Sequence, residues 1–339
     1  MKPKVLLDPH PRTLELLFAP RDLRRLKSLV RPTVWEGSRM PADMVEKILP
    51  DALAVIGQTD LPRERLERAK QLKAIVNVEG NFQPNIDYEF CFERGIHVLG
   101  AGVAFGKAVA EMALGMALAL ARGIPDADRH FRTGKEVYGR FSNQESFLLS
   151  GSDVGFIGFG NLGRALIPLL TPFRCRVRVY DPWLADGWLS EYGVIPSSLD
   201  DVLSASRILF VLAGATAENR AMIGKRELDR MRRGACLVLA SRASLVDFDA
   251  LTAKLRQGTI RAALDVFPQE PFPKTHPLRR LDNVILSAHR AGSLPSSYRL
   301  MGEMLVDDLG QILRGLPPLR LQRAERETVA RMRSLPVKA

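Results

Sequence analysis

Short apolar runs rich in β-branched residues alternate with longer segments of helical period along most of the chain. This alternation is typical of βα units and of parallel sheets. In the first third of the chain, the apolar runs predict strands and the segments between them predict helices. The strands are expected at 4–7, 53–56, 74–78 and 97–99, and the helices at 41–49, 62–72 and 85–94.

A second series of strands begins after residue 152. Before it, residues 108–122 predict a long helix of Ala, Leu and Met, and residues 133–152 are polar without a clear period. Six parallel strands suit a doubly wound, dinucleotide-binding sheet. Residues 296–313 predict a last long helix, and the charged tail 314–339 has no strand pattern. The six strands are expected at 154–158, 177–180, 208–212, 236–239, 260–266 and 284–287.

A glycine-rich turn follows the first strand of this second series and leads into a helical segment. In the sequence Gly158-Phe-Gly160-Asn-Leu-Gly163, the first glycine allows a tight turn and the second lets the backbone approach a pyrophosphate. The third permits close packing of helix on strand. Asp181 ends the next strand, where a carboxylate can bind ribose hydroxyls and repel a 2′-phosphate, which favours NAD over NADP. The alternatives are a loop with glycines for turn geometry alone and a turn acid before Pro182.

Three polar residues follow later strands of the same series, and ligands of open parallel sheets bind beyond the carboxyl ends of strands. They are Arg242, Glu270 and His289. A guanidinium can anchor the carboxylate of a 2-oxo acid, an imidazole can give a proton to its carbonyl, and a carboxylate can orient that imidazole. Each residue also has a simpler interpretation, as a surface charge, a loop acid or a packed histidine.

The segments around these residues resemble a known family. GFIGFGNLGRAL (155–166), LDRMRRGACLVLASRASLVDFDAL (228–251), AALDVFPQEP (262–271) and NVILSAHRAG (283–292) are similar to the signature blocks of the NAD-dependent D-isomer-specific 2-hydroxyacid dehydrogenases. Segments 85–98 and 108–122 resemble the family more loosely. The resemblance implies two Rossmann-like α/β domains. A doubly wound parallel-sheet cofactor domain (108–296) would be inserted in a smaller flavodoxin-like substrate domain (1–107 and 297–339).

The resemblance also implies roles for individual residues. Arg242 would bind the substrate carboxylate and carbonyl, and His289, paired with Glu270, would be the acid/base. Asp265 would meet the nicotinamide carboxamide, and Thr216 would lie near the adenosine side of the cofactor. The other predicted cofactor contacts are Asn161, Leu162 and Ala240, beside Gly158, Gly160, Gly163 and Asp181, and the predicted substrate contacts are Gly80, Asn81 and Arg242.

The chain departs from the family pattern in the loop expected to bind the substrate carboxylate. Where the family usually has GxGxDN, this chain reads Glu79-Gly-Asn-Phe-Gln-Pro-Asn85. Glu79 adds a negative charge where an anion should bind, and Phe82 changes the freedom of the loop backbone. The stretch 100–107 replaces a more polar segment, and Ala243 replaces the usual glycine after Arg242. These changes leave the catalytic residues intact and bear on the identity of the substrate.

Composition narrows the class of protein. The formal net charge is 49 − 38 = +11, but the basic residues are scattered through helical segments rather than grouped with aromatics, so we expect no nucleic-acid partner. Three separated cysteines without CxxC spacing fit a reducing cytoplasm, and we expect no metal. The start of the chain lacks the apolar centre of a secretory signal, and the apolar stretch 108–121 has too few residues to span a bilayer.

We therefore predict a cytoplasmic oxidoreductase, a homodimer by resemblance, that interconverts a D-2-hydroxy acid and its 2-oxo acid with NAD(H). A glyoxylate- or hydroxypyruvate-like acid is the expected substrate. One alternative is a dinucleotide-sensing, corepressor-like binding module with little turnover, which the altered loop and basic surface leave open. Another is an enzyme of the same architecture with a different donor, such as formate.

Overall fold

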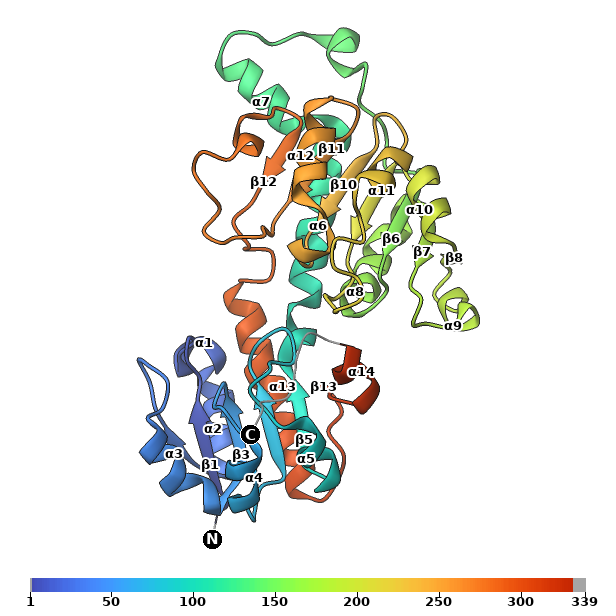
Figure 1. Ribbon diagram of the computed structural model, residues 1–339. Helices are drawn as coiled ribbons and strands as arrows, with labels where there is room; N and C mark the ends of the chain where they lie inside the picture. The colour runs from blue at the N-terminus through green and yellow to red at the C-terminus, as the bar shows by residue number, and fades with distance from the viewer. Residues whose placement is uncertain (1, 332–339) are drawn as a thin grey trace. The chain divides into compact units, whose positions relative to one another are not determined.

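The computed structural model describes residues 2–331 and contains two compact units. Among the described residues, unit 1 comprises 2–105 and 293–331, and unit 2 comprises 106–292. The end of the predicted substrate domain, 332–339, lies outside the described residues. The insertion of one α/β unit in another agrees with the expected fold class, and each unit contains its own sheet (Figure 1).

The sheet of unit 1 has the order β2-β1-β3-β4-β5-β13. The first five strands are parallel in the flavodoxin-like order 2-1-3-4-5, and β13 is antiparallel to β5. The sequence did not predict β2, which contains Pro32 and is only partly buried, or the two-residue β13 in the charged tail. The strands are β1 (Lys4–Asp8), β2 (Arg31–Val34), β3 (Ala52–Gly57), β4 (Ala74–Asn77), β5 (His97–Gly100) and β13 (Gln322–Arg323).

Alternate side chains of this sheet enter two separate cores. Val5 and Leu7 point into a core shared with α1, α2 and α13, whereas Leu6 points into a core shared with α3, α4 and α5. This alternation is what a parallel sheet covered on both faces requires. The helices are α1 (Leu14–Leu17), α2 (Pro20–Leu29), α3 (Ala42–Ile48), α4 (Arg63–Arg68), α5 (Tyr88–Glu93), α13 (Pro295–Leu313) and α14 (Arg326–Arg331).

The sheet of unit 2 has the order β8-β7-β6-β9-β10-β11-β12, and all its pairs are parallel. Numbered in chain order from β6, its strands lie in the order 3-2-1-4-5-6-7, which contains the doubly wound order 3-2-1-4-5-6 and confirms the predicted sheet. The sequence did not predict β8, which has two residues. The strands are β6 (Asp153–Ile157), β7 (Arg176–Tyr180), β8 (Ile195–Pro196), β9 (Ile208–Val211), β10 (Cys236–Leu239), β11 (Arg261–Leu264) and β12 (Val284–Leu286).

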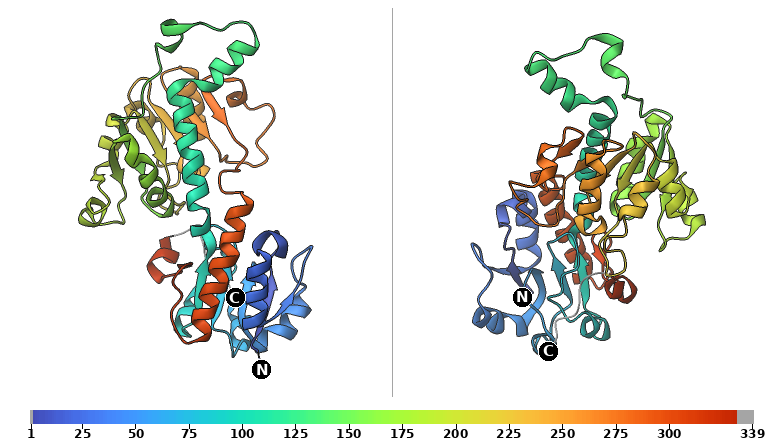
Figure 2. Two further views of the ribbon diagram at one scale, coloured as in Figure 1. Left: turned by 180° about the vertical axis from the view of Figure 1, so that it is seen from behind. Right: turned by 45° about the horizontal axis from the view of Figure 1, so that its top comes forward.

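Helices cover both faces of this second sheet as well. α10, α11 and α12 share a core with one face, and α6 packs on β10, β11 and α8 at the other face, where it lies along the sheet (Figure 2). α7 carries no buried residue. The helices are α6 (Gly106–Arg122), α7 (Ile124–Arg132), α8 (Asn161–Leu170), α9 (Asp186–Ser190), α10 (Leu199–Ala205), α11 (Lys225–Arg230) and α12 (Phe248–Arg256).

The helical stretch Ala101–Arg122 is long and apolar enough to cross a membrane by length and composition alone. The sequence-based estimate from the shorter apolar stretch 108–121 was therefore wrong about length. Half of its 18-residue apolar window is buried inside the protein, and α6 packs against the sheet of unit 2. The core helices of soluble proteins can have the same length and apolar composition, so these two properties are weak evidence for a membrane span.

Candidate active site

The three glycines of the turn after β6 occupy three different environments. Gly158 has φ +90°, and a Cβ there would lie 2.5 Å from the Cα of Ala213. A Cβ on Gly163 would lie 3.0 Å from the ring of Phe159, so this glycine lets α8 approach its preceding strand. Gly160, the N-cap of α8, has no heavy atom within 4 Å of its Cβ position. The turn is therefore packed at its first and third glycines and open at its second.

Asp181 holds this glycine-rich turn through its side chain. Its Oδ2 accepts a hydrogen bond from the backbone N–H of Phe159 at 2.8 Å, and its Oδ1 accepts one from Trp183 at 3.1 Å. Each carboxylate oxygen can accept a further hydrogen bond, so both contacts leave room for ribose hydroxyls. The sequence predicted Asp181 as a cofactor ligand, but it did not predict this second role in fixing the turn.

The other predicted cofactor residues lie at the same edge of the sheet. Asn161 and Leu162 form the first turn of α8, whose N–H groups have no acceptor within the helix. Thr216 lies in the loop after β9, where its N–H donates to Asn219 Oδ1 at 2.8 Å and its hydroxyl accepts from Asn219 N–H. Ala240 is buried directly after β10. These positions form one edge because β6, β9 and β10 are neighbouring parallel strands.

Arg242, Glu270 and His289 extend from three adjacent strands. Leu239, Leu264 and Leu286 are aligned across β10, β11 and β12 by the strand register. Arg242 and His289 each follow their aligned residue by three positions, and Glu270 follows by six. Since neighbouring strands lie about 4.8 Å apart, the ends of β10 and β12 are about 10 Å apart. Arg242 Nη1 donates to the carbonyl of Ser241 at 2.7 Å.

Glu270 and His289 contact each other directly. Glu270 Oε2 is 2.6 Å from His289 Nδ1, and Glu270 Oε1 accepts from the backbone N–H of Phe267 at 2.9 Å. The carboxylate is thus fixed from both sides. Their side chains are 37% and 49% exposed, so the pair is accessible to a ligand. With Nδ1 held by Glu270, Nε2 is the imidazole nitrogen that can exchange a proton with a substrate.

Asp265 organises the loop that carries His289. This aspartate is 1% exposed, and its two carboxylate oxygens accept from the backbone N–H groups of Arg290 and Ala291, each at 3.0 Å. The backbone N–H of His289 donates to the Asp265 carbonyl at 2.7 Å. His289 itself has φ +49°, which is unfavourable for a residue other than glycine. The contacts of Asp265 maintain this backbone conformation. No sequence pattern indicated this role of Asp265.

The predicted substrate loop of unit 1, which contains Gly80 and Asn81, follows β4. No described residue accepts the backbone N–H groups of Gly80, Asn81 or Phe82. Phe82 is 3% exposed and packs edge-on against Tyr88, so its ring belongs to the core of unit 1. Glu79 is paired with Arg12, which follows β1. The loop therefore offers unused amides, and the charge of its glutamate is compensated.

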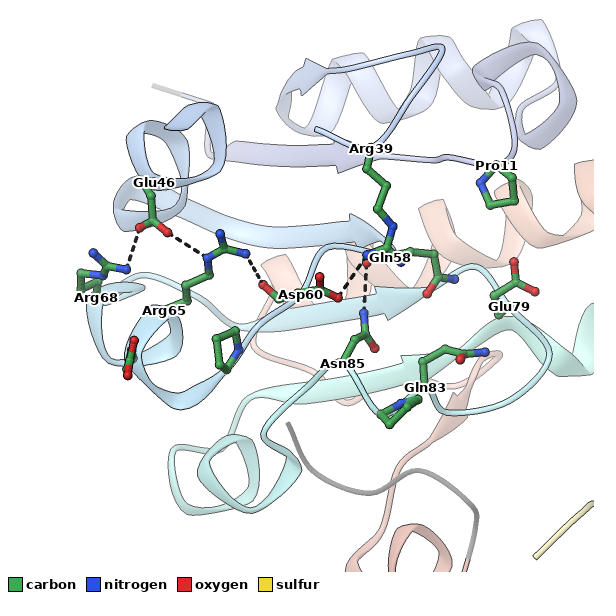
Figure 3. A pocket seen from close by; sticks show the side chains of 13 residues that line it. Pro11, Arg39, Glu46, Gln58, Asp60, Arg65, Arg68, Glu79, Gln83 and Asn85 are labelled. Carbon is green, nitrogen blue, oxygen red and sulfur yellow. Dashed lines mark hydrogen bonds and ion pairs between the residues drawn. The ribbon is translucent and has the colours of Figure 1, made fainter. Parts of the chain in front are cut away.

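A pocket of about 870 Å³ in unit 1 adjoins this loop (Figure 3). Of its lining residues, Pro11, Gln58 and Glu79 follow the ends of β1, β3 and β4. The strand order reverses between β1 and β3, and ligands of open sheets bind at such reversals. Figure 3 shows Glu46 with Arg65 and Arg68 at one end of the pocket and Glu79 at the other. Glu46 accepts from Arg65 at 2.8 Å and contacts Arg68 at 2.7 Å, so these guanidinium groups are already paired.

A family model for the NAD-binding domain of D-isomer specific 2-hydroxyacid dehydrogenases matches residues 114–291, which include the glycine-rich turn and the Arg242, Glu270 and His289 positions. The chain belongs to this dehydrogenase family. The match confirms the predicted family and the predicted cofactor, NAD. The roles of single residues at this site stay predictions.

Curated relatives of this dehydrogenase family member include two kinds of enzyme. This chain is 33% identical over 276 residues to a D-3-phosphoglycerate dehydrogenase of Methanocaldococcus jannaschii. The match covers 80% of this chain and 52% of that relative. The chain thus spans about half the length of the phosphoglycerate dehydrogenases that it matches first. It is 31% identical over 324 residues to a glyoxylate reductase of Korarchaeum cryptofilum, covering 94% of this chain and 95% of that enzyme.

A solved structure agrees with the fold of this chain over nearly its whole length. A crystal structure described as a phosphoglycerate oxidoreductase from Rhizobium etli is 46% identical, with a TM-score of 0.88. The match covers 97% of this chain and 100% of that one. Both units of the fold are therefore shared with that protein.

The cofactor edge of unit 2 fits an NAD molecule by its own geometry. The open space at Gly160, the N-terminus of α8 and the nearby Asp181 match the needs of a pyrophosphate and a ribose. Ala243, which replaces the usual glycine, is buried and begins a short 3₁₀ helix, so its methyl group is accommodated. The departures from the family pattern therefore concern unit 1 more than the cofactor edge.

Proposed function

We propose that this protein interconverts a D-2-hydroxy acid and its 2-oxo acid with NAD(H), as a reductase of small acids such as glyoxylate or hydroxypyruvate. The observation that carries the proposal is the 2.6 Å contact between Glu270 and His289 at the same edge of the sheet as the dinucleotide turn. An acid/base pair beside a nicotinamide site is what reduction of a carbonyl needs. The names of the relatives support this substrate class.

In the direction of reduction, His289 gives the proton at Nε2 to the carbonyl oxygen of the 2-oxo acid. Glu270 stabilises the protonated imidazole through Nδ1 and keeps the ring oriented. Arg242 binds the substrate carboxylate, for which its planar pair of donors is suited. When bound, NADH supplies the hydride and NAD⁺ accepts it in the reverse reaction. In that reverse reaction, neutral His289 takes the hydroxyl proton.

The test is a panel of substrates with purified full-length protein. NADH oxidation is measured with glyoxylate, hydroxypyruvate and bulkier 2-oxo acids, and NAD⁺ reduction with the D-2-hydroxy acids and with formate. Turnover of one or more oxo acids supports the proposal. NADH binding without turnover of any acid would contradict it and favour a dinucleotide-sensing module, and turnover of formate alone would favour a different donor.

We also propose that the protein is a homodimer in which α7 and the segment after it contact a second copy. α7 has no buried residue, and Ile124 and Phe131 on it are exposed. Tyr138 and Phe141, farther along the same segment, are exposed as well. Such a concentration of large apolar side chains supports a protein interface. Light scattering should give a dimer mass for the protein and a lower mass for Phe131→Glu/Phe141→Glu.

A cytoplasmic location is proposed from the cysteines. Cys91, Cys175 and Cys236 are all free thiols, and Cys91 and Cys236 are buried. Free thiols are typical of a reducing compartment. We further propose that the protein binds small 2-oxo and 2-hydroxy acids as substrates, and that it binds neither nucleic acid nor a membrane. Fractionation of cells that express a tagged full-length chain would test the location.

A further inference from the structure

Arg12 and Glu79 form a two-point ion pair between the loops after β1 and β4. Arg12 Nη1 is 2.5 Å from Glu79 Oε1, and Arg12 Nη2 is 3.3 Å from Glu79 Oε2. The Arg12 guanidinium also lies over the ring of Tyr298, 5.2 Å from its centroid. The side chains are 12% and 30% exposed. The pair is therefore held by its fork geometry, by stacking and by partial burial, unlike a mobile surface ion pair.

The backbone of Glu79 is fixed as firmly as its side chain. Its N–H donates to Asn77 Oδ1 at 2.7 Å, and Gln58 Nε2 donates to the same oxygen at 2.9 Å. Asn77 and Gln58 are both buried. Glu79 therefore stands in one place directly before Gly80, whose N–H has no acceptor among the described residues.

Two donors beside this loop lack partners. Arg12 Nε and Asn77 Nδ2 are buried and make no hydrogen bond among the described residues. Buried donors without acceptors are unfavourable and are expected to be satisfied by a ligand or by water. Together with the amides of Gly80, Asn81 and Phe82, they make the surroundings of Glu79 suited to an anion. The carboxylate of Glu79, which directly precedes these amides, opposes an anion there.

We propose that Arg12 is a positioning residue for the substrate, which acts by neutralising Glu79 so that the loop can bind the carboxylate of a 2-oxo acid. This inference rests on the proposed function. Without Arg12, the charge of Glu79 would lie beside the incoming carboxylate in a partly buried place, where repulsion is strong. With Arg12 the loop is neutral, its amides are available, and the glutamate that departs from the family pattern no longer prevents binding.

The test compares Arg12→Gln, Glu79→Gln and the double variant in steady-state reduction of the best 2-oxo acid. We expect the KM of Arg12→Gln to rise about tenfold, with kcat changed less than about twofold, because only the carboxylate loop gains a net negative charge. Glu79→Gln should lower KM, since Arg12 then adds an uncompensated positive charge. The double variant should return KM to within about threefold of the starting value, because the loop is neutral again.

Two further measurements separate this role from a structural one. The KM increase of Arg12→Gln should shrink at high salt, because screening weakens charge repulsion. The NADH dissociation constant should stay unchanged, since the dinucleotide turn belongs to unit 2. Arg63→Gln removes the same charge from an exposed pair with Glu67 in α4 and should leave KM unchanged.

An unchanged KM in Arg12→Gln overturns the inference. A double variant whose KM is as high as that of Arg12→Gln also overturns it, because Arg12 would then have a structural role. If Arg12→Gln does not fold, Arg12→Lys and Glu79→Gln carry the test. Arg12→Lys should keep KM within about threefold because it keeps the charge, and a KM of Glu79→Gln that does not fall overturns the inference. If the starting protein reduces no acid, the proposed function and this inference both fail. If the starting protein reduces an acid but substitution of Arg12 and of Glu79 leaves KM unchanged, only the inference fails.

Discussion

The carboxylate of Asp265 allows a quantitative test of how unit 2 presents His289. Asp265 is 1% exposed, and its oxygens accept the N–H groups of Arg290 and Ala291 at 3.0 Å each. Asp265→Asn keeps the shape but turns one acceptor into a donor that faces a backbone N–H. The loss of one charge-assisted hydrogen bond costs about 1.5–3 kcal/mol, and one buried N–H left without an acceptor costs about 1–3 kcal/mol.

These losses exceed the cost of the left-handed conformation of His289, which is roughly 1–2 kcal/mol for a residue with a side chain. We therefore expect the loop to relax and the imidazole to move away from its position beside Glu270. Because a misplacement of about 1 Å can lower a rate about 100-fold, kcat of Asp265→Asn should fall by about that factor. The measurement is steady-state reduction of the best 2-oxo acid with NADH.

A double variant shows whether the loss passes through His289. If Asp265 acts by positioning this histidine, Asp265→Asn/His289→Ala should be about as slow as His289→Ala alone. Asp308→Asn is a matched control, because Asp308 is a buried aspartate of unit 1 that accepts backbone N–H groups of Leu319, Arg320 and Leu321. It should lower the unfolding temperature with kcat unchanged. A kcat of Asp265→Asn close to the starting value, or losses that multiply in the double variant, would refute this reasoning.

Three other outcomes are expected. His289→Ala should lower kcat about 10²–10⁴-fold with nearly unchanged NADH affinity in a fluorescence titration, and a large loss of affinity would mean that this histidine is misassigned. Asp181→Ala should relax discrimination against NADPH. It should also weaken NADH binding about tenfold, because the Asp181 carboxylate accepts the N–H of Phe159. Unchanged binding of both cofactors would contradict this. Hydrogen bonding from Arg176 lowers the pKa of Asp153, with a smaller contribution from Arg178, so the pair stabilises the fold above the ordinary aspartate pKa and the benefit is lost as the pH falls through the lowered value. Asp153→Asn should therefore lower the unfolding temperature at pH 7, and its difference from the original protein should shrink as the pH falls through the lowered pKa. A difference that stays constant with pH would argue against the ion pair.

The buried strands could be predicted from the sequence because apolar runs must lie in a core. β2 and β13 could not, since β2 contains Pro32 at a partly buried edge and β13 is held by backbone pairing with β5 rather than by an apolar pattern. Strand ends likewise indicated His289 and Glu270, whose contact the structure contains. The Arg12–Glu79 pair had no local signal, because 67 positions separate the two residues. Asp265 supports the His289 loop through backbone N–H groups. Every residue except proline has such a group, so the sequence does not indicate this contact.

The order of the chain has a consequence for synthesis on the ribosome. Residues 2–105 emerge before unit 2, and the apolar side chains of Val5, Leu7 and Ile56 face a core that Met301 and Leu305 of α13 complete. The 187 residues of unit 2 intervene (292 − 105), and at about 5–20 residues per second they take roughly 10–40 s to translate. During that interval, we expect the apolar core of the nascent segment 2–105 to stay partly exposed. We expect chaperones to bind this protein most strongly at that stage.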